Sequence, residues 1–552
     1  MAIVALTAAC MLPAAAAAAD LRPCAGGARC GSVTVPLVAA DPAAGSASVG
    51  FQLYAHRRGS KPRDTVLVSA GSDGMPTTAG RAALLALLDP LRDRRDIVLV
   101  DARGTGLSGR VGDRRDAYGA AAAADDLDAV RAELGAGHVE LYGAGDGARI
   151  ALAYAVRHAD KLRSLVLDGG PPATLLAGDG RAQAQALAKA LGPAQGVVAR
   201  LAARLRVHPL HAGGRIDDDV LARLAARADA RTLAQLPGAS TAALHGDSVP
   251  LARLVAASAP PAARQAAQAR ASSCHDDAAP APAAQVDGGP FSGATWLRAL
   301  GLAACKNWPA ATTPDPVLPA GAALSAAPAL VLAGEHDVAA PTSTLRKLAA
   351  LLPAGRFVRV RGAGALPALS DPAGCAAALV RAFLQTRGHL SPGCASRPAR
   401  PQAVSAFPLR LATANAALRD ANAHGRDRST LSDRRAATAA ALGVADALAG
   451  AEAASAPTRV PGLRGGAALV TRRGTLVTLT LRGSRFVSDA ALDGIVTHDG
   501  KTGSVYAAVT LRGRDGSLRA FVLTWNTSQA KGYAAARGSV DTRALLLVLP
   551  AP

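Results

Sequence analysis

The sequence predicts an α/β protein in which a mostly parallel sheet is interrupted by a helical insertion and followed by a β-rich segment. Two short runs rich in β-branched residues, 65–69 and 96–100, each lead into a glycine-rich turn, and the helical pattern of residues 82–91 separates them. Strands that alternate with helices form βαβ units, in which the strands are parallel. Residues 171–320 instead carry helices rich in Ala, Leu and Arg without a convincing strand, and strand patterns crowd together beyond residue 461.

The remaining elements extend this pattern in chain order. The expected strands of the main sheet are residues 33–37, 50–54, 138–142, 164–168, 329–333 and 356–360. The expected helices beside it are residues 120–134, 148–158 and 375–386. Later residues are expected to form a linker at 396–401, a mostly helical stretch at 409–452, and strands at 474–481, 504–512 and 518–525, the last two joined by a hairpin turn at 513–516.

A chain of 552 residues, 50% of them hydrophobic, is long enough for two or three domains. The expected division is a signal peptide at 1–19, the first part of the α/β core at 20–170, a helical cap at 171–320, the second part of the core at 321–396, a linker and helical segment at 397–460, and a C-terminal β-rich module at 461–552.

The first 19 residues are an Ala-rich apolar run that ends in small residues before Asp20, as a secretory signal peptide does, although no basic residues precede the run. The run is too short and too rich in Ala to span a membrane. We therefore expect a protein that is secreted or held at the cell envelope, with no transmembrane segment.

Six of the seven cysteines lie outside this leader, and an even number of cysteines in an exported chain favours disulfides. Their order along the chain favours pairing Cys24 with Cys30, Cys274 with Cys305, and Cys375 with Cys394. The sequence contains no Cys-x-x-Cys pair, which disfavours zinc. We expect neither a metal nor a cofactor.

The formal net charge of +20 is large enough to attract nucleic acid. However, the Arg residues are scattered instead of forming blocks, and aromatic residues, which stack on bases, make up only 3% of the chain. We therefore expect no nucleic-acid partner.

At residues 141–154 a predicted strand passes through a sharp glycine turn into a predicted helix. In a nucleophile elbow of sequence G-x-S-x-G, the serine occupies a strained turn, and small flanking residues let the strand and the helix approach closely. Gly143 and Gly147 match the flanking glycines. The central position is Gly145, which has no side chain.

Together with Asp101-Ala-Arg-Gly-Thr-Gly-Leu-Ser108, this region resembles the tripeptidyl-aminopeptidase and proline-iminopeptidase branch of the α/β hydrolases, in which D-x-R-G-x-G-x-S precedes the elbow. The resemblance spans most of the chain and includes Cys30-Gly-Ser-Val-Thr-Val-Pro36, Gly246-Asp-Ser-Val-Pro-Leu251 and Cys305-Lys-Asn-Trp-Pro309. It implies an α/β-hydrolase fold with a helical cap, retained disulfides and descent from exported peptidases.

The resemblance also implies positions for the acid and the base. Gly334-Glu-His-Asp-Val-Ala-Ala-Pro341 matches the family pattern G-x-x-D-x-x-x-P, so Asp337 stands at the acid position. The family's histidine follows G-x-G, and here Ala365 stands in that place. Without a histidine, Asp337 is expected to cap the following loop or to pair with an arginine.

The oxyanion loop of the family, Gly-Gly-Pro-Gly, corresponds here to Ala70-Gly-Ser-Asp-Gly74. Asp73 would place a negative charge where preorganised hydrogen-bond donors are needed. Three parts of one catalytic apparatus therefore depart from the family pattern, and we expect no Ser-His-Asp hydrolysis.

Other residues could replace the missing groups. Asp146 becomes a carboxylate nucleophile if the elbow slips by one residue, and Ser72 is a second candidate. A carboxylate that interacts with the helix N-terminus is the simpler interpretation of Asp146. His336 or His275 could act as a substitute base, and His275 beside two aspartates could hold a metal, although these neighbours lack the helical i,i+4 spacing of a metal motif.

Three functional hypotheses follow. The first is a non-catalytic secreted hydrolase homologue that binds a peptide or another small ligand in the cleft under the cap. The second is an active exported peptidase or esterase with a non-standard nucleophile. The third is an adhesion role at the cell envelope for residues 401–552.

Overall fold

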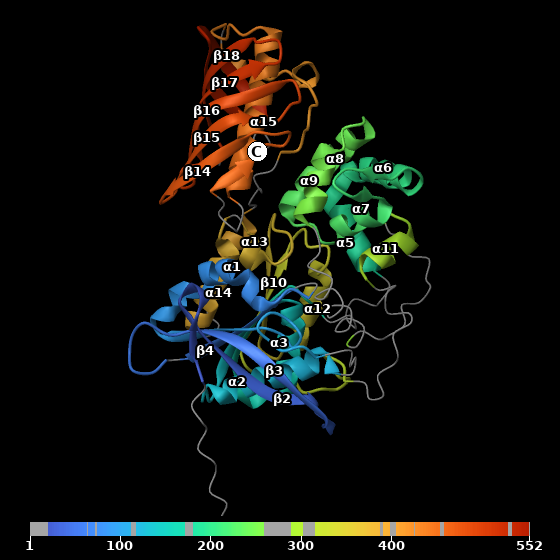
Figure 1. Ribbon diagram of the computed structural model, residues 1–552, viewed down its shortest axis with the longest axis vertical. Coiled ribbons are helices and arrows are strands. Elements are labelled where there is room, and N and C mark those ends of the chain that lie inside the picture. The colour runs from blue at the N-terminus through green and yellow to red at the C-terminus, as the bar shows by residue number, and fades with distance from the viewer. Residues whose placement is uncertain are drawn as a thin grey trace, which may run out of the picture.

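The computed structural model is shown in Figure 1. It describes residues 20–62, 64–71, 74–111, 117–171, 180–258, 276, 289–301, 315–371, 373–386, 390–397, 404–423, 425–452, 458–527 and 533–550.

The main sheet has nine strands in the order β1-β2-β3-β5-β4-β6-β7-β10-β11. The six strands from β5 to β11 in this order pair parallel to one another, whereas β1, β2 and β3 form an antiparallel edge. The strands are β1 (Arg22–Cys24), β2 (Ala28–Val38), β3 (Asp41–Tyr54), β4 (Asp64–Gly71), β5 (Arg95–Val100), β6 (Val139–Gly145), β7 (Leu162–Asp168), β10 (Ala329–Gly334) and β11 (Gly355–Val360). The predicted α/β class with a mostly parallel sheet is confirmed.

Helices cover both faces of this sheet, which explains why its central strands are almost continuously apolar. One face packs against α2 (Ala120–Glu133), α3 (Asp146–Arg157) and α12 (Thr342–Leu351). The other packs against α1 (Arg81–Leu88) and α14 (Cys375–Thr386).

The insertion between β7 and β10 is a helical cap, as predicted. Its described helices are α5 (Arg181–Leu191), α6 (Gln195–Val207), α7 (Asp218–Ala226), α8 (Ala230–Leu244), α9 (Val249–Ala257) and α11 (Gly293–Ala299). The expectation that it contains no strand is wrong at one place, because β8 (Leu210–His211) and β9 (Arg215–Ile216) form a short hairpin. Gly213 and Gly214, with φ of 69° and 152°, permit the tight turn between them.

The C-terminal module contains a second, wholly antiparallel sheet in the order β12-β20-β19-β18-β17-β16-β15-β14-β13. Its strands are β12 (Leu418–Arg419), β13 (Arg459–Pro461), β14 (Ala467–Arg473), β15 (Leu476–Ser484), β16 (Ala490–Asp499), β17 (Ser504–Gly513), β18 (Leu518–Asn526), β19 (Tyr533–Val540) and β20 (Arg543–Pro550). The predicted hairpin joins β17 to β18.

Helix α15 (Leu431–Ala451) packs on one face of this second sheet. The predicted helical stretch 409–452 is wrong in its first half, whose described residues form two short 3-10 helices and β12 but no α-helix. The helix begins where Thr430 and Asp433 form a capping box, with Thr430 Oγ1 accepting from the N–H of Asp433 at 3.1 Å. The capping residues, and not the Ala-rich composition, therefore determine where it starts.

The cap and the C-terminal module share one hydrophobic core. Arg253 of α9 makes a bidentate ion pair with Asp446 of α15 at 2.6 and 2.7 Å, and Arg464 pairs with Asp247 of the cap at 2.5 Å. Helix α15 consequently lies between the second sheet and the cap, as Figure 1 shows.

Two of the three expected disulfides are confirmed, Cys24–Cys30 and Cys375–Cys394. Cys274 and Cys305 lie outside the described residues. Within the described part of the chain, no helix combines the length and the apolar character needed to cross a bilayer.

Candidate functional site

The glycine elbow joins β6 to α3 at the carboxyl edge of the main sheet. Gly145, the last residue of β6, has φ 59° and ψ −125°, a backbone conformation that residues with a side chain rarely adopt. The strand and the helix approach closely, since a methyl group added at Gly147 would lie 1.9 Å from the carbonyl oxygen of Ser69 on β4. The sharp turn expected from the sequence is therefore present, with Gly145 at its apex.

Gly71, at the end of β4, pairs with Gly145 on β6. The loop that would supply oxyanion donors thus begins beside the elbow apex. Ser72 and Asp73 lie outside the described residues. The effect of Asp73 on an oxyanion, and the role of Ser72 as a nucleophile, stay predictions.

Asp337 lies on the loop after β10 and is 2% exposed. Its Oδ1 accepts a hydrogen bond from the N–H of Ala340 at 2.8 Å, so the carboxyl caps its own loop. Of the two expected arrangements, loop capping and pairing with an arginine, the structure has the first. Burial raises the pKa of Asp337 to about 7. Among the residues that the structure describes, no histidine or arginine pairs with this carboxyl.

Ala365 lies on the loop between β11 and α13 (Pro367–Ser370). The cap packs directly on this loop, because a methyl group added at Gly364 would lie 2.4 Å from the backbone nitrogen of Ala230, the first residue of α8. Leu366, the next residue, has φ 51°, which is unusual for a residue with a branched side chain. The position expected for a catalytic histidine is thus held between the cap and the sheet.

A two-glycine turn after β7 brings these regions together. A methyl group added at Gly170 would meet the carbonyl oxygen of Gly145 at 1.8 Å. One added at Gly169 would lie 3.8 Å from Asp337 Oδ2 and 3.4 Å from Leu366 Cδ2. The elbow, the acid loop and the Ala365 loop therefore meet around one turn.

Asp168, which sequence reasoning did not select, lies beside this turn at the end of β7. Its carboxyl accepts hydrogen bonds from the hydroxyl of Tyr142 at 2.9 Å and from the N–H of Ala368 at 3.2 Å. Complete burial, with a further contribution from the charge of Asp337, raises the pKa of Asp168 to about 7. The sequence signal was an aspartate that ends an apolar strand before Gly-Gly.

Asp146 faces a different space. It lines a cavity of about 60 Å³ together with Gly71, Arg149 and Asp276, on the side of the elbow nearest β4 and α2. Neither Asp337 nor a histidine is among the described lining residues. Asp146 therefore does not share this cavity with Asp337.

Of the three residues considered as a metal site, Asp276 alone lies in the described part of the chain. Asp276 accepts hydrogen bonds from the N–H of Ala120 at 2.9 Å and from Arg149 at 3.3 Å. His275 and Asp277 lie outside the described residues, and the described ones contain no cluster of three metal ligands.

His336, the other candidate base, lies on the acid loop. Its backbone N–H donates to the carbonyl oxygen of Ala363 at 2.9 Å, which ties the acid loop to the Ala365 loop. The described contacts of Asp337 do not include the imidazole of His336.

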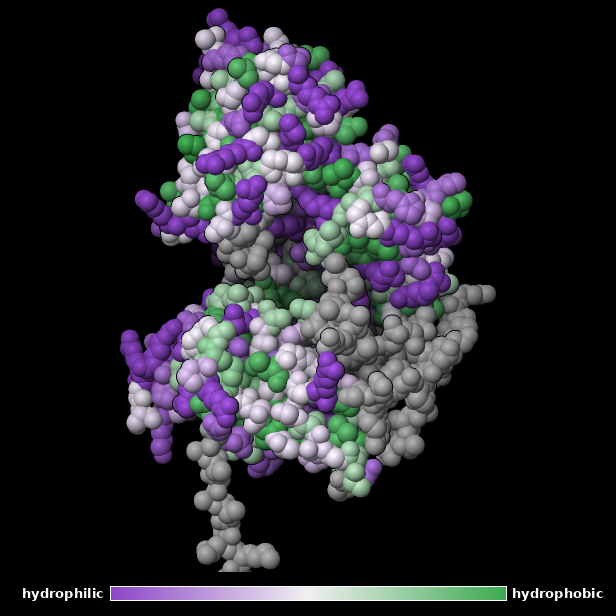
Figure 2. All heavy atoms as spheres, in the orientation of Figure 1, coloured by the Kyte–Doolittle hydropathy of each residue, from purple (hydrophilic) through white to green (hydrophobic). Residues whose placement is uncertain are grey.

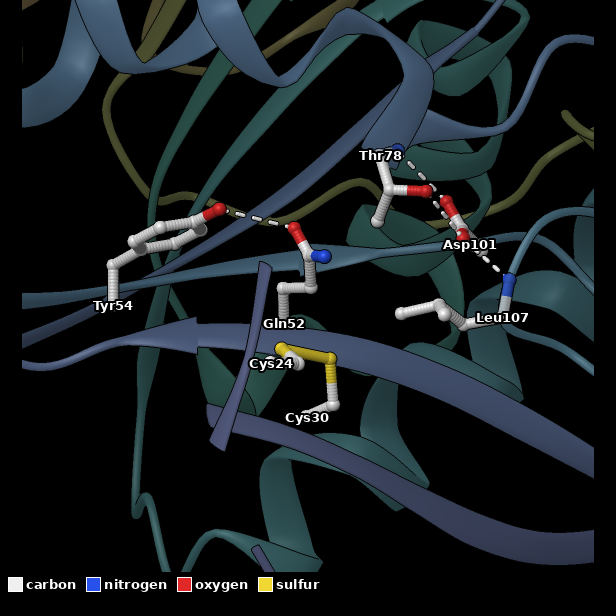
Figure 3. The surroundings of a disulfide bond; sticks show 7 residues. All are labelled: Cys24, Cys30, Gln52, Tyr54, Thr78, Asp101 and Leu107. Carbon is white, nitrogen blue, oxygen red and sulfur yellow. Dashed lines mark hydrogen bonds between the residues drawn. A yellow bond between two sulfur atoms is a disulfide. The ribbon is translucent and has the colours of Figure 1, made fainter. Parts of the chain in front are cut away.

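The Asp101–Ser108 motif forms a hydrogen-bonded turn around the buried Asp101 at this edge of the sheet. Figure 3 shows Asp101 accepting hydrogen bonds from the N–H and hydroxyl of Thr78, at 2.8 and 2.7 Å, and from the N–H of Leu107 at 2.8 Å. The hydroxyl of Ser108 donates to the carbonyl of Asp101 at 2.7 Å and accepts from the N–H of Gly50 at 2.9 Å. These contacts give the motif a positioning role.

Parts of this chain are similar to known proteins. The profile of a family described as alpha/beta hydrolase fold matches residues 79–372. A thermophilic esterase from Thermogutta terrifontis is 20% identical over 65% of this chain and 99% of that chain, with a TM-score of 0.34. The proline iminopeptidase of Mycobacterium smegmatis is 18% identical over 64% of this chain and 98% of that chain, with a TM-score of 0.33. No curated protein sequence matches the chain.

Proposed function

Because the chain belongs to the alpha/beta hydrolase fold family, we propose that it is an exported, non-catalytic member related to the tripeptidyl-aminopeptidase branch, binding a peptide or another small ligand beneath the cap. The observation that carries the proposal is Gly145 at the apex of the elbow. The attacking hydroxyl of this fold comes from that position, and glycine has no group to replace it.

The energetic cost of these losses is large. In a well-studied serine protease, removing the triad costs on the order of 10⁶-fold in kcat, and the remaining acceleration depends on the oxyanion hole and on substrate binding. Here the methyl group of Ala365 also replaces the base. Asp337, with a pKa of about 7, is largely neutral in mildly acidic solution and does not supply a fixed negative charge there.

The disulfides Cys24–Cys30 and Cys375–Cys394 support export, because such bonds persist in oxidising compartments. The Ala-rich leader at 1–19 also supports export, because secretory signal peptides have this composition. The proposed ligand site lies where the cap meets the carboxyl edge of the main sheet, the edge at which α8 contacts the Ala365 loop.

The first test uses the purified mature protein with aminoacyl and tripeptidyl anilides and with a fluorophosphonate. We expect no released chromophore and no covalent labelling, while equilibrium dialysis shows that an anilide binds without being cleaved. Labelling, or turnover that Asp146→Asn abolishes, contradicts the proposal and favours a non-standard nucleophile.

The second test restores the expected groups in Gly145→Ser/Ala365→His. Because the elbow already has the strained geometry, we expect the double variant to react with the fluorophosphonate. The matched control Gly145→Ala/Ala365→His has the same backbone change without a hydroxyl and is expected to stay unlabelled. A folded serine variant that does not react contradicts the expectation that these two changes alone restore the nucleophile.

A further inference from the structure

We propose that the outer face of the C-terminal sheet binds an extended acidic polysaccharide. The outer face is the side of that sheet opposite α15. This inference is independent of the proposed function, because all the residues that carry it belong to the C-terminal module and none to the elbow, the acid loop or the Ala365 loop.

The strand register defines which side chains share the outer face. Residues that pair directly across neighbouring strands point to the same side of a sheet. Alternate residues of these strands, such as Val505 and Phe521, are buried in the core that contains α15, so the rows between them face away from it. One outward row is Thr471, Thr478, Thr497, Tyr506, Thr524 and Arg537, and the next is Arg459, Leu469, Thr480, Ile495, Ala508, Val522 and Ser539.

The outer face is basic. Its two aspartates are already engaged within it, because Asp493 accepts from Arg512 at 2.6 Å and Asp499 accepts from the hydroxyl of Thr475 at 2.9 Å. Among the residues that the structure describes, no carboxylate forms an ion pair with any of the other outward arginines. All five outward arginines are exposed, and they are Arg459, Arg473, Arg482, Arg512 and Arg537.

Arginines on the opposite side of the same sheet are paired. Arg519 and Arg543 both contact Asp433 at the start of α15, at 3.3 and 2.9 Å. The module therefore supplies carboxylates where its arginines face inward, and leaves most of those that face outward to an external acid.

The spacing of the outward arginines requires an extended partner. Arg473 on β14 and Arg537 on β19 are separated by five strand spacings, which amount to about 24 Å. Guanidinium groups so far apart cannot converge on one small anion, so the partner must carry acidic groups at intervals. Each exposed contact is weak in water, and several on one polymer combine into stable binding.

Hydroxyl groups occupy the space between these two arginines. The threonine hydroxyls of Thr471, Thr478 and Thr497 form no hydrogen bond with any described residue, whereas that of Thr524 donates to the carbonyl oxygen of Arg537 at 3.2 Å. A free hydroxyl can both donate and accept, which matches the hydroxyl groups of a sugar.

The only aromatic residue of these two rows also suits a sugar ring. Tyr506 lies in the middle of its row and is 44% exposed, so it offers a flat apolar surface together with a hydroxyl. Figure 2 shows strongly hydrophilic side chains next to ones of intermediate hydropathy on the uppermost lobe, which this module forms. A single aromatic residue is too few to stack successive bases of a nucleic acid. Short side chains on a flat face are also a poor match for a lipid surface, which binds a strongly apolar helix face.

The first test measures binding of the mature protein to an oligomer of polygalacturonate, a linear acidic polysaccharide, and to neutral dextran at about 0.15 M salt. We expect the wild type to bind polygalacturonate and not dextran. Arg473→Gln/Arg482→Gln/Arg537→Gln is expected to raise the dissociation constant at least about tenfold, because three charged contacts are lost.

The matched control is Arg58→Gln/Arg200→Gln/Arg356→Gln, which removes the same charge at three exposed arginines outside the module. Its dissociation constant should stay close to that of the wild type. An equal loss of affinity in the two triple variants overturns the proposal, because binding would then follow the net charge of the chain and not the outer face.

The second test separates sugar recognition from attraction to any polyanion. Thr478→Val/Thr497→Val removes two hydroxyls while keeping the charge and the β-branched shape, and we expect the dissociation constant to rise roughly fivefold. An unchanged constant overturns the proposal. So does binding to phosphatidylglycerol vesicles or to single-stranded DNA that is as tight as binding to polygalacturonate.

A third measurement does not depend on how the arginine variants fold. Tyr506→Cys places a thiol in the middle of the row, and polygalacturonate is expected to slow its reaction with a maleimide whereas dextran is not. A labelling rate that polygalacturonate leaves unchanged while it binds the protein shows that the polymer lies elsewhere, and overturns the proposal.

Discussion

The carboxyls of Asp168 and Asp337 lie inside the protein at the carboxyl edge of the main sheet, where each is held by hydrogen bonds from uncharged groups. Two buried carboxylates that act on one another are costly to ionise together. The raised pKa of each group follows from burial first, and for Asp168 also from the neighbouring charge. Burial thus brings the pKa of both carboxyls close to neutral pH.

This arrangement predicts a pH-dependent stability. Folding raises the pKa of each carboxyl from about 4 in the unfolded chain to about 7, so their contribution is fully present below about pH 4 and is lost as the pH rises through 7. Asp337→Asn cannot titrate. In urea titrations between about pH 5 and pH 8, the variant is therefore expected to lose less unfolding free energy than the wild type.

Asp93→Asn, which changes an exposed carboxyl near β5, is the matched control and should follow the wild-type pH profile. Asp168→Asn should behave as Asp337→Asn does. If the unfolding free energy changed with pH by the same amount in the wild type and in both buried variants, these carboxyls would already be ionised in the folded protein over this pH range.

The elbow is an element whose geometry depends on small residues. Helix α3 begins directly after Gly145, and its second residue, Gly147, lies against the backbone of β4. The motif is recognisable in the sequence because its glycines fall at every second residue of a short segment. The close approach to Ser69 is visible only in the structure, since that residue is far away in sequence.

Gly147→Ala is expected to destabilise the protein by roughly 1–3 kcal/mol, because the added methyl group would force α3 away from β4. The control Gly196→Ala places the same methyl group on the exposed side of α6 and is expected to raise stability by up to about 1 kcal/mol. Urea midpoints of the two variants measure both effects. Equal midpoints would refute the close contact.

Across the whole molecule, the cap and the C-terminal module share a core although they are far apart in sequence. Arg253 and Asp446 join α9 to α15, and the Asp446 side chain is 8% exposed whereas that of Arg253 is 32% exposed. Helix α15 is buried along most of its length, and its many alanines allow neighbouring elements to approach from more than one side.

Asp446→Asn is expected to lower the free energy that holds the cap to the C-terminal module by about 1–3 kcal/mol. The loss is smaller than for a fully buried ion pair, because Arg253 is partly exposed. Native-state proteolysis should then cleave α9 and α15 faster, and at matched rates. Asp493→Asn removes the exposed partner of Arg512 within the same module and should leave both rates unchanged. Faster cleavage of α15 alone would contradict a shared core.

By itself, the sequence determined the elements with local signals. Short apolar strands, glycine turns and helical periodicity predict the parallel sheet and the cap, because these patterns involve near neighbours in the chain. The predicted roles of Gly145, Asp337 and Ala365 come instead from the resemblance to a known family. Tertiary structure alone decided that Asp168 lies beside Asp337, that Asp146 faces a separate cavity, and that the cap rests on α15. Those relations join residues separated by tens to hundreds of positions, and packing, not local propensity, brings them together.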